Sequence, residues 1–152
     1  MHKKPELNLR AKALDFLSRR DYSYLELFNK LSKYTDNEMA IRNILDEMVS
    51  KNFLNEERYI EAFINSKSRK FGSKKIRYLL CSKVSNSDLV NDIYSKTEIN
   101  ELQIACEQLI KKYPSPPQDN KERAKYLRFL LNRGFSYEII NQALAQAYEV
   151  EL

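Results

Sequence analysis

The stretch RAKALDFLSRRDYSY at residues 10–24 decides the fold, because it returns near the other end of the chain as RAKYLRFLLNRGFSY at residues 123–137. The two copies carry the same residue type at Arg10/Arg123, Ala11/Ala124, Lys12/Lys125, Leu14/Leu127, Phe16/Phe129, Leu17/Leu130, Arg20/Arg133, Ser23/Ser136 and Tyr24/Tyr137. An internal repeat indicates small units, each with an apolar face that a neighbouring unit buries. The sequence therefore predicts a row of helical modules.

Residues that break helices are rare in this chain. The glycines are Gly72 and Gly134, and apart from Pro5 the prolines fall at 114, 116 and 117. Apolar residues recur with a helical period between these points, which predicts an all-α fold. The expected helices span residues 7–20, 24–33, 38–51, 56–70, 73–82, 88–94, 98–112, 119–132 and 136–148.

Several positions within these helices have specific expected roles. Ser23 followed by Glu26 is the pattern of a capping box, and Asp119 is expected to cap the helix that follows it. Residues 51–55 repeat the order of the turn at 133–136, with a basic residue, a turn former, an aromatic residue and an N-cap. The side chains expected to face the interior include Leu27, Leu31, Tyr34, Ala40, Ile41, Ile44, Leu45, Met48 and Val49.

The helices group into three tandem three-helix repeats of the helix-turn-helix type. Their expected bounds are residues 7–53, 54–95 and 96–148, and the proline-rich segment 114–117 is a loop inside the third repeat. Each repeat holds only about 45 residues, which is close to the size below which a core does not stabilise itself. We therefore expect neighbouring repeats to pack on one another.

Composition sets limits on the class of protein. The 26 basic and 21 acidic residues give a formal charge of +5, which is compatible with a polyanionic partner but does not demand one. Cys81 and Cys106 lack the spacing of a metal site, and no disulfide is expected. The N-terminal residues do not resemble a signal peptide, and no apolar run approaches the roughly 18 residues of a membrane span. We expect a cytoplasmic protein without a membrane partner.

Enzyme signatures are missing from the sequence. It contains none of the motifs GxxxxGK[ST], HExxH or GxSxG, and its single histidine is His2. A nucleophile would therefore have to be activated by a lysine or a carboxylate, and no such pair stands out. The sequence predicts a protein that is not an enzyme, with no catalytic residue, no metal and no cofactor.

The densest positive charge lies between residues 67 and 77. Phe71 inside it either stacks on a base or fastens the two helices together, and the second role is favoured. A positive φ angle at Gly72 would place the amides at the start of the next helix beside the lysines, where they attract phosphate. A solvated surface without a partner is the alternative. The candidate binding residues are Lys67, Arg69, Lys70, Lys74, Lys75 and Arg77.

A second set of basic residues comes from the repeated stretches. Arg20 and Arg133 fall at helix C-termini, where a cation stabilises the helix dipole, so a structural role is favoured for both. The further binding candidates are Lys12, Arg19, Lys125 and Arg128. We interpret the tyrosines at 22, 24, 34, 59, 126 and 137 as residues at the edge of the core rather than as stacking platforms.

Several segments together resemble the bacterial RecX regulators. They are residues 13–27 with Lys30 and Leu31, LNEERYIEAF at 54–63, RKFG at 69–72 with Ile76 and Leu79, and FLLNRGFS at 129–136. The order of the motifs fits over nearly the whole chain. One departure is Lys83-Val84-Ser85, where a Lys-Gly-apolar turn is expected.

The resemblance implies an elongated, curved row of three-helix modules. It also implies a non-enzymatic regulator that binds the RecA recombinase filament on DNA and generally inhibits recombinase and ATPase activity. The implied partners are RecA and single-stranded DNA, with double-stranded DNA left open, and we expect a monomer.

Two other functions stay open at this point. The first is a sequence-specific DNA-binding protein, because helical hairpins before a third helix also describe helix-turn-helix modules. The expected helix 38–51 carries Glu38, Asp46 and Glu47 with few basic residues, which favours contact with protein. The second is a purely structural helical scaffold.

Overall fold

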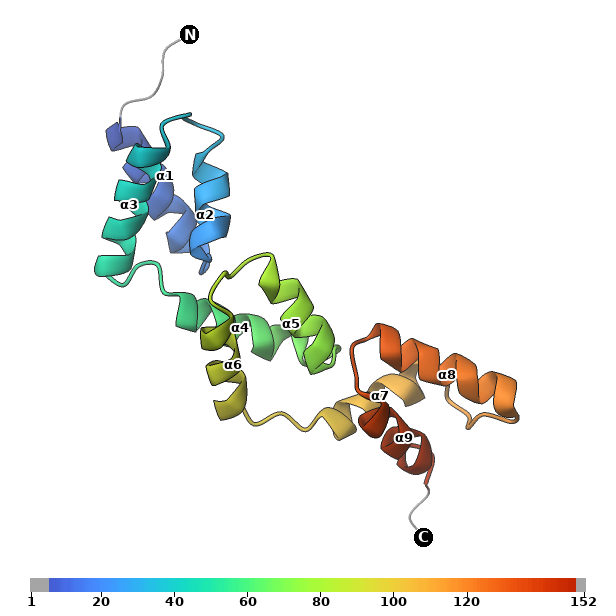
Figure 1. Ribbon diagram of the computed structural model, residues 1–152. Coiled ribbons are helices and arrows are strands. Elements are labelled where there is room, and N and C mark those ends of the chain that lie inside the picture. Colours follow the sequence, from blue (N-terminus) through green and yellow to red (C-terminus); the bar gives the residue numbers. More distant parts are fainter. Residues whose placement is uncertain (1–5, 150–152) are drawn as a thin grey trace. The chain divides into compact units, whose positions relative to one another are not determined.

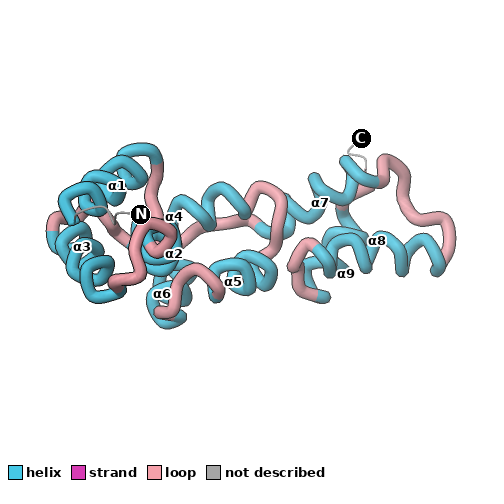
Figure 2. Tube along the Cα trace, turned by 90° about the horizontal axis from the view of Figure 1, so that it is seen from above, coloured by secondary structure: helices cyan, strands magenta, loops and turns pink. Residues whose placement is uncertain are grey.

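The computed structural model of the chain describes residues 6–149, and within this range it contains helices and no strand (Figures 1 and 2). This confirms the predicted all-α class. The nine described helices are α1 (Glu6–Arg19), α2 (Tyr24–Leu31), α3 (Glu38–Ser50), α4 (Glu56–Lys67), α5 (Ser73–Cys81), α6 (Ser87–Lys96), α7 (Glu101–Lys112), α8 (Asn120–Asn132) and α9 (Tyr137–Gln146).

The chain divides into two compact units. The first unit comprises residues 1–62 and 80–93, and the second comprises residues 63–79 and 94–152. The boundary between them passes through α4, α5 and α6, so each of these helices contributes residues to both units. The three-repeat division at 7–53, 54–95 and 96–148 stays a prediction.

In the first unit, α1, α2 and α3 pack against one another around an apolar core. The interior faces of α2 and α3 were predicted correctly at Leu27, Leu31 and most positions of α3. The predictions for Tyr34 and Val49 were wrong, because these side chains are 38% and 47% exposed. Tyr34 follows the last turn of α2, and Val49 lies at the edge of the apolar stripe of α3.

In the second unit, α7, α8 and α9 surround an apolar core of their own. The rings of Tyr113 and Tyr126 stack with their centroids 4.0 Å apart. The Tyr126 hydroxyl donates to the carbonyl of Ser115, and the Tyr148 hydroxyl donates to the carbonyl of Tyr113, both at 2.8 Å. These bonds fasten the proline-rich loop and the end of α9 to the same aromatic cluster.

The helix caps follow the sequence closely. Ser23 and Glu26 form the reciprocal capping box at the start of α2. Asp119 and Ser136 cap α8 and α9, where each side-chain oxygen accepts a backbone N–H three residues later. Because each cap satisfies an amide that has no partner within its helix, it sets the residue at which the helix begins.

The turn after α3 has the backbone pattern of the turn after α8, as the repeated order predicted, but it buries a different side chain. Asn52 adopts a φ of 63°, and the N–H groups of Phe53 and Leu54 both donate to the carbonyl of Met48. Phe53 is 46% exposed, whereas Phe135 at the corresponding position is buried, and Leu54 is buried in place of Phe53. Asn55 still caps α4, as expected, by accepting the N–H of Arg58.

Candidate functional site

The second unit carries the net positive charge of the chain. It holds 14 of the 26 lysines and arginines and 8 of the 21 acidic residues, so its formal charge is +6, whereas the first unit, with 12 and 13, is at −1. Six of those basic residues lie in residues 67–77, a stretch without an acidic residue. The second unit is therefore the part of the chain that attracts a polyanion.

The α4–α5 turn lies against the α8–α9 turn inside this unit. The Gly72 N–H donates to the carbonyl of Arg133 at 2.8 Å, and the Lys74 N–H donates to the carbonyl of Gly134 at 3.2 Å. A Cβ atom on Gly72 would collide with the Gly134 carbonyl. The positive φ considered for Gly72 is not found there, since the positive-φ glycine among the described residues is Gly134, at 93°. Gly72 is glycine because the two backbones meet there.

The amides at the start of α5 already have protein acceptors. Besides Gly72 and Lys74, the N–H of Ser73 donates to Oε1 of Glu101 at 2.9 Å. The phosphate site expected at this helix N-terminus is therefore occupied by carbonyl groups and a carboxylate from the same unit. Any phosphate attracted to this surface must be held by the basic side chains themselves.

Phe71 is half-buried beneath several cations. The Nζ atoms of Lys75 and Lys70 lie 5.1 and 5.7 Å from the centroid of its ring, and the Arg133 guanidinium lies 5.7 Å away. Arg133 also donates to Oε1 of Gln108, whose amide donates to the carbonyl of Arg69. These contacts tie the α4–α5 turn to α7 and to the C-cap of α8.

The basic residues of this turn differ in what they offer to a partner. Lys75 and Lys67 are half-buried, and Lys75 donates to the carbonyl of Asn132 while Lys67 lies over the ring of Phe63. In contrast, Arg69, Lys70 and Lys74 are exposed, and none of them lies within ion-pair distance of a carboxylate in the described part of the chain. These three residues are the exposed, uncompensated cations of the turn.

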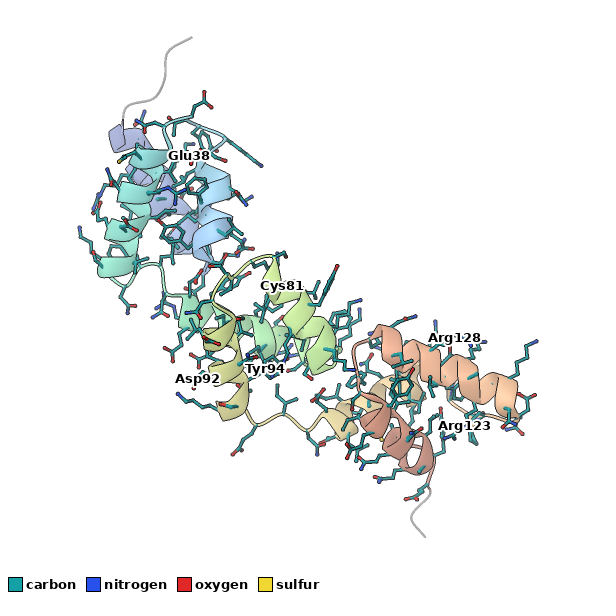
Figure 3. The ribbon with its side chains drawn as sticks, viewed as in Figure 1. Glu38, Cys81, Asp92, Tyr94, Arg123 and Arg128 are labelled. Carbon is teal, nitrogen blue, oxygen red and sulfur yellow. The ribbon has the colours of Figure 1, made fainter. Side chains whose placement is uncertain are left out.

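One face of α8 also carries exposed basic residues. Lys121, Lys125 and Arg128 are exposed and occupy positions i, i+4 and i+7 of the helix. The stripe that they form leads to Asn132, whose carbonyl accepts the Lys75 ammonium. Figure 3 shows the side chains of Arg123 and Arg128 projecting from α8. We call the exposed residues Arg69, Lys70, Lys74, Arg77, Lys121, Lys125 and Arg128 the basic surface of the second unit.

Lys12 and Arg19, the remaining candidates, belong to the first unit and have partners there. Lys12 lies over the ring of Tyr34 at 4.8 Å, and Arg19 pairs with Asp15 at 3.0 Å. Ion pairing with carboxylates is general among the arginines of this unit, as the pairs Arg10–Glu47, Arg20–Glu26, Arg42–Glu38 and Arg58–Asp21 show.

The first unit also has a cleft of about 780 Å³ that the sequence did not predict. Leu25 and Val49, which are 43% and 47% exposed, give it an apolar lining. Two of its carboxylates are engaged within the cleft, since Asp46 accepts the hydroxyl of Tyr24 and Glu56 accepts the Tyr24 N–H. The cleft therefore presents apolar surface.

Tyr78, on the same helix as Lys74 and Arg77, is an exposed residue that the sequence interpretation missed. Its side chain is 74% exposed on α5, whereas Ile76 and Leu80 on the same helix are buried. Residues two positions away from a buried i, i+4 pair face the opposite side of a helix. In α5 this rule predicts that Tyr78 faces solvent, on the same side of the helix as Lys74 four residues earlier.

Two other kinds of site are absent from the described residues. Residues 6–149 contain no group of three or more His, Cys, Asp or Glu side chains placed to hold a metal ion. Nor does any helix in that range combine the length and apolarity needed to cross a bilayer.

Comparison with known proteins places these features in a family. Residues 99–144 match the family model described as the third three-helix domain of RecX. The regulatory protein RecX of Neisseria meningitidis serogroup C is 36% identical over 146 residues, which is 96% of this chain and 95% of that protein. The protein of the same name from Leptothrix cholodnii is 33% identical over 95% of this chain and 92% of its own length.

A solved structure shares the fold. The crystal structure of RecX from Lactobacillus salivarius matches with a TM-score of 0.77 at 22% identity, covering 93% of this chain and 96% of that one. The structural match shows a shared fold, and the sequence identity to relatives that the chain covers almost completely shows that it belongs to the RecX family of regulatory proteins.

Proposed function

We propose that this protein is a non-enzymatic, cytoplasmic regulator that binds the RecA recombinase filament on DNA and inhibits its recombinase and ATPase activities. Membership of the RecX family supports a regulatory role, and the family resemblance supports RecA as the target. We further propose that it acts as a monomer in DNA repair and recombination.

The basic surface of the second unit carries this proposal. A nucleoprotein filament presents phosphate groups next to protein, and exposed cations without carboxylate partners bind such phosphates by releasing counterions. Arg69, Lys70 and Lys74 meet this condition. We propose that they contact DNA in the filament together with Arg77, Lys125 and Arg128, and that Lys67 and Lys75 hold the turn in place.

The distribution of charge favours this function over a helix-turn-helix reader of duplex sequence. Such a reader carries its base and phosphate contacts on the third helix of a module. Helix α9 has the sequence YEIINQALAQ, without lysine or arginine, and in α3 the guanidinium of Arg42 pairs with Glu38 at 3.5 Å. The cations of the basic surface lie instead on α5, α8 and the α4–α5 turn.

Strand exchange by the cognate RecA tests the proposed function. The protein is added at increasing concentration to preassembled filaments, and its binding is followed by co-sedimentation in the same samples. We expect strand exchange to fall as the protein saturates the filament. Unchanged strand exchange at saturation would contradict inhibition, and a preference for one duplex sequence over scrambled duplexes would support the helix-turn-helix alternative.

A further inference from the structure

The cleft of the first unit is lined by apolar side chains that solvent reaches. Leu25 of α2 and Val49 of α3 are 43% and 47% exposed, and the half-buried side chains of Phe28 and Leu89 line it as well. Its volume of about 780 Å³ has room for several side chains of another molecule. Exposed apolar residues that gather in a concave surface with polar residues around them are typical of an interaction site.

Three carboxylates line the same cleft without a cation beside them. Asp46 accepts the Tyr24 hydroxyl at 3.1 Å and Glu56 accepts the Tyr24 N–H at 2.8 Å, but both donors are uncharged. Glu57 is exposed. Within the described part of the chain, no lysine or arginine lies within ion-pair distance of these three carboxylates. The apolar lining is therefore accompanied by uncompensated negative charge.

The basic residues of the cleft are paired with carboxylates that do not line it. The Arg42 guanidinium lies 3.5 Å from Glu38 and over the ring of Phe28, 5.1 Å from the centroid. The Lys83 ammonium lies 3.6 Å from Oε2 of Glu26. Because each of these cations has its own acidic partner, neither balances the three carboxylates of the lining.

This charge favours a protein over a nucleic acid as the occupant of the cleft. Uncompensated carboxylates repel phosphate groups, and the first unit as a whole has a formal charge of −1 against +6 for the second. A protein segment that carries a lysine or arginine next to a large apolar side chain matches both the apolar lining and its charge.

We propose that the cleft binds a segment of the RecA subunit in which a large apolar side chain lies next to a lysine or arginine. The apolar side chain packs on Leu25 and Val49, and the basic side chain lies beside Glu57 and Asp46. The inference rests on the proposed function and deepens it, because it assigns the protein contact to the first unit and the DNA contact to the second.

Co-sedimentation with RecA filaments on single-stranded DNA tests the apolar part of the contact. Leu25→Gln is compared with Met39→Gln, since each residue is exposed and is the second residue of its helix, but Met39 does not line the cleft. We expect Leu25→Gln to weaken binding to the filament roughly 5- to 30-fold. Met39→Gln should bind like the wild type.

A second pair of variants tests the charge. Glu57 and Glu61 are both exposed on α4, and of the two only Glu57 lines the cleft. Glu57→Gln should weaken binding roughly 2- to 5-fold at low salt, the difference should shrink as the salt concentration rises, and Glu61→Gln should have no effect. Thermal melts show whether each variant is folded. Equal affinity of the wild type, Leu25→Gln and Glu57→Gln for the filament would overturn the proposal.

Two further measurements separate RecA from other occupants. Fluorescence anisotropy with labelled oligothymidylate, without RecA, should show no difference between the wild type and Leu25→Gln. An equal loss of affinity for the oligonucleotide and for the filament would overturn the proposal, because the cleft would then act through DNA. Self-association of the protein that Leu25→Gln abolishes, measured by analytical ultracentrifugation, would also overturn it, because a second copy would then fill the cleft.

Failure of the inference differs from failure of the proposed function in the same sedimentation experiment. If the wild type does not sediment with the filament, the proposed function is wrong and the inference falls with it. If the wild type sediments and the cleft variants sediment equally, the inference alone is wrong, and the protein contacts the filament elsewhere.

Discussion

Gly72 and Gly134, the two glycines of the chain, lie in direct contact. A Cβ atom on either would enter the backbone or side-chain volume of the other turn, and the Gly72 N–H donates to the carbonyl of the residue just before Gly134. The α4–α5 turn and the α8–α9 turn therefore have the shape that close approach of two backbones requires. The basic side chains at residues 67–77 are held by this contact.

Replacement of Gly72 by alanine should destabilise the second unit. The added methyl group meets the Gly134 carbonyl, and overpacking of this kind costs about 1–3 kcal/mol. Gly134→Ala should cost at least as much, because alanine there also has to adopt a φ of 93°. Urea denaturation measures both effects against Ser66→Ala, an exposed change on α4. Wild-type stability of Gly72→Ala would show that the turns do not meet as described.

The N-caps in the two copies of the repeated stretch should contribute equally to stability. Ser23→Ala and Ser136→Ala each remove one bond from a hydroxyl to an amide at the start of a helix, and each should lower the free energy of unfolding by about 1 kcal/mol. Ser115→Ala, in the exposed proline-rich loop, is the control. If either cap variant unfolds at the same urea concentration as this control, that cap contributes nothing.

Stability should depend on Glu47 in a defined pH range. Hydrogen bonds from Arg10 and Lys51 lower the pKa of Glu47 from 4.5 to about 2. Because the folded pKa is the lower one, the stabilisation is complete above pH 4.5 and is lost as the pH falls through about 2. Glu47→Gln should therefore melt below the wild type at pH 7, and the difference should close at pH 2.

Thermal melts of the two proteins across this range provide the measurement. Glu57→Gln, which removes an exposed carboxylate from α4, is the matched control and should melt close to the wild type at neutral pH. A difference between Glu47→Gln and wild type that stays constant down to pH 2 would exclude the ion pair as its cause.

Charge reversal should separate the basic surface from general electrostatics. Lys74→Glu and Lys33→Glu change the net charge of the chain equally at two exposed lysines, one in each unit. Lys74→Glu should weaken binding to the filament and reduce the slope of log K against log salt concentration by about one. Equal effects of the two variants would mean that only net charge matters. Lys75 is a poorer choice, because it also donates to Asn132.

Local signals in the sequence predicted most of the helices and their caps. The repeat, the scarcity of glycine and proline, and the serines at 23 and 136 act within a few residues, so they can be read directly from the chain. Boundaries were less accurate at some C-terminal ends, and α4 ends at Lys67 rather than near residue 70. The departure at Lys83-Val84-Ser85 did not break the fold, since Val84 is buried and Asn86 caps α6.

The candidate site was only partly predictable, because its geometry depends on contacts between distant residues. The density of positive charge at residues 67–77 is visible in the sequence. The pairing of Gly72 with Gly134 and of Ser73 with Glu101 is not, and it reversed the expected role of the α5 amides. The helical period of α5 predicts that Tyr78 is exposed, but only the charged residues of this stretch were interpreted as candidates.

The rate of ATP hydrolysis by the cognate RecA on single-stranded DNA tests the central claim most directly. The wild-type protein, Lys74→Glu and Lys33→Glu are titrated into the reaction at fixed RecA and DNA concentrations. The account predicts a dose-dependent fall with the wild type and Lys33→Glu, and a shift to higher concentration with Lys74→Glu. A rate that stays unchanged at concentrations where co-sedimentation shows a saturated filament would contradict regulation of RecA by this protein.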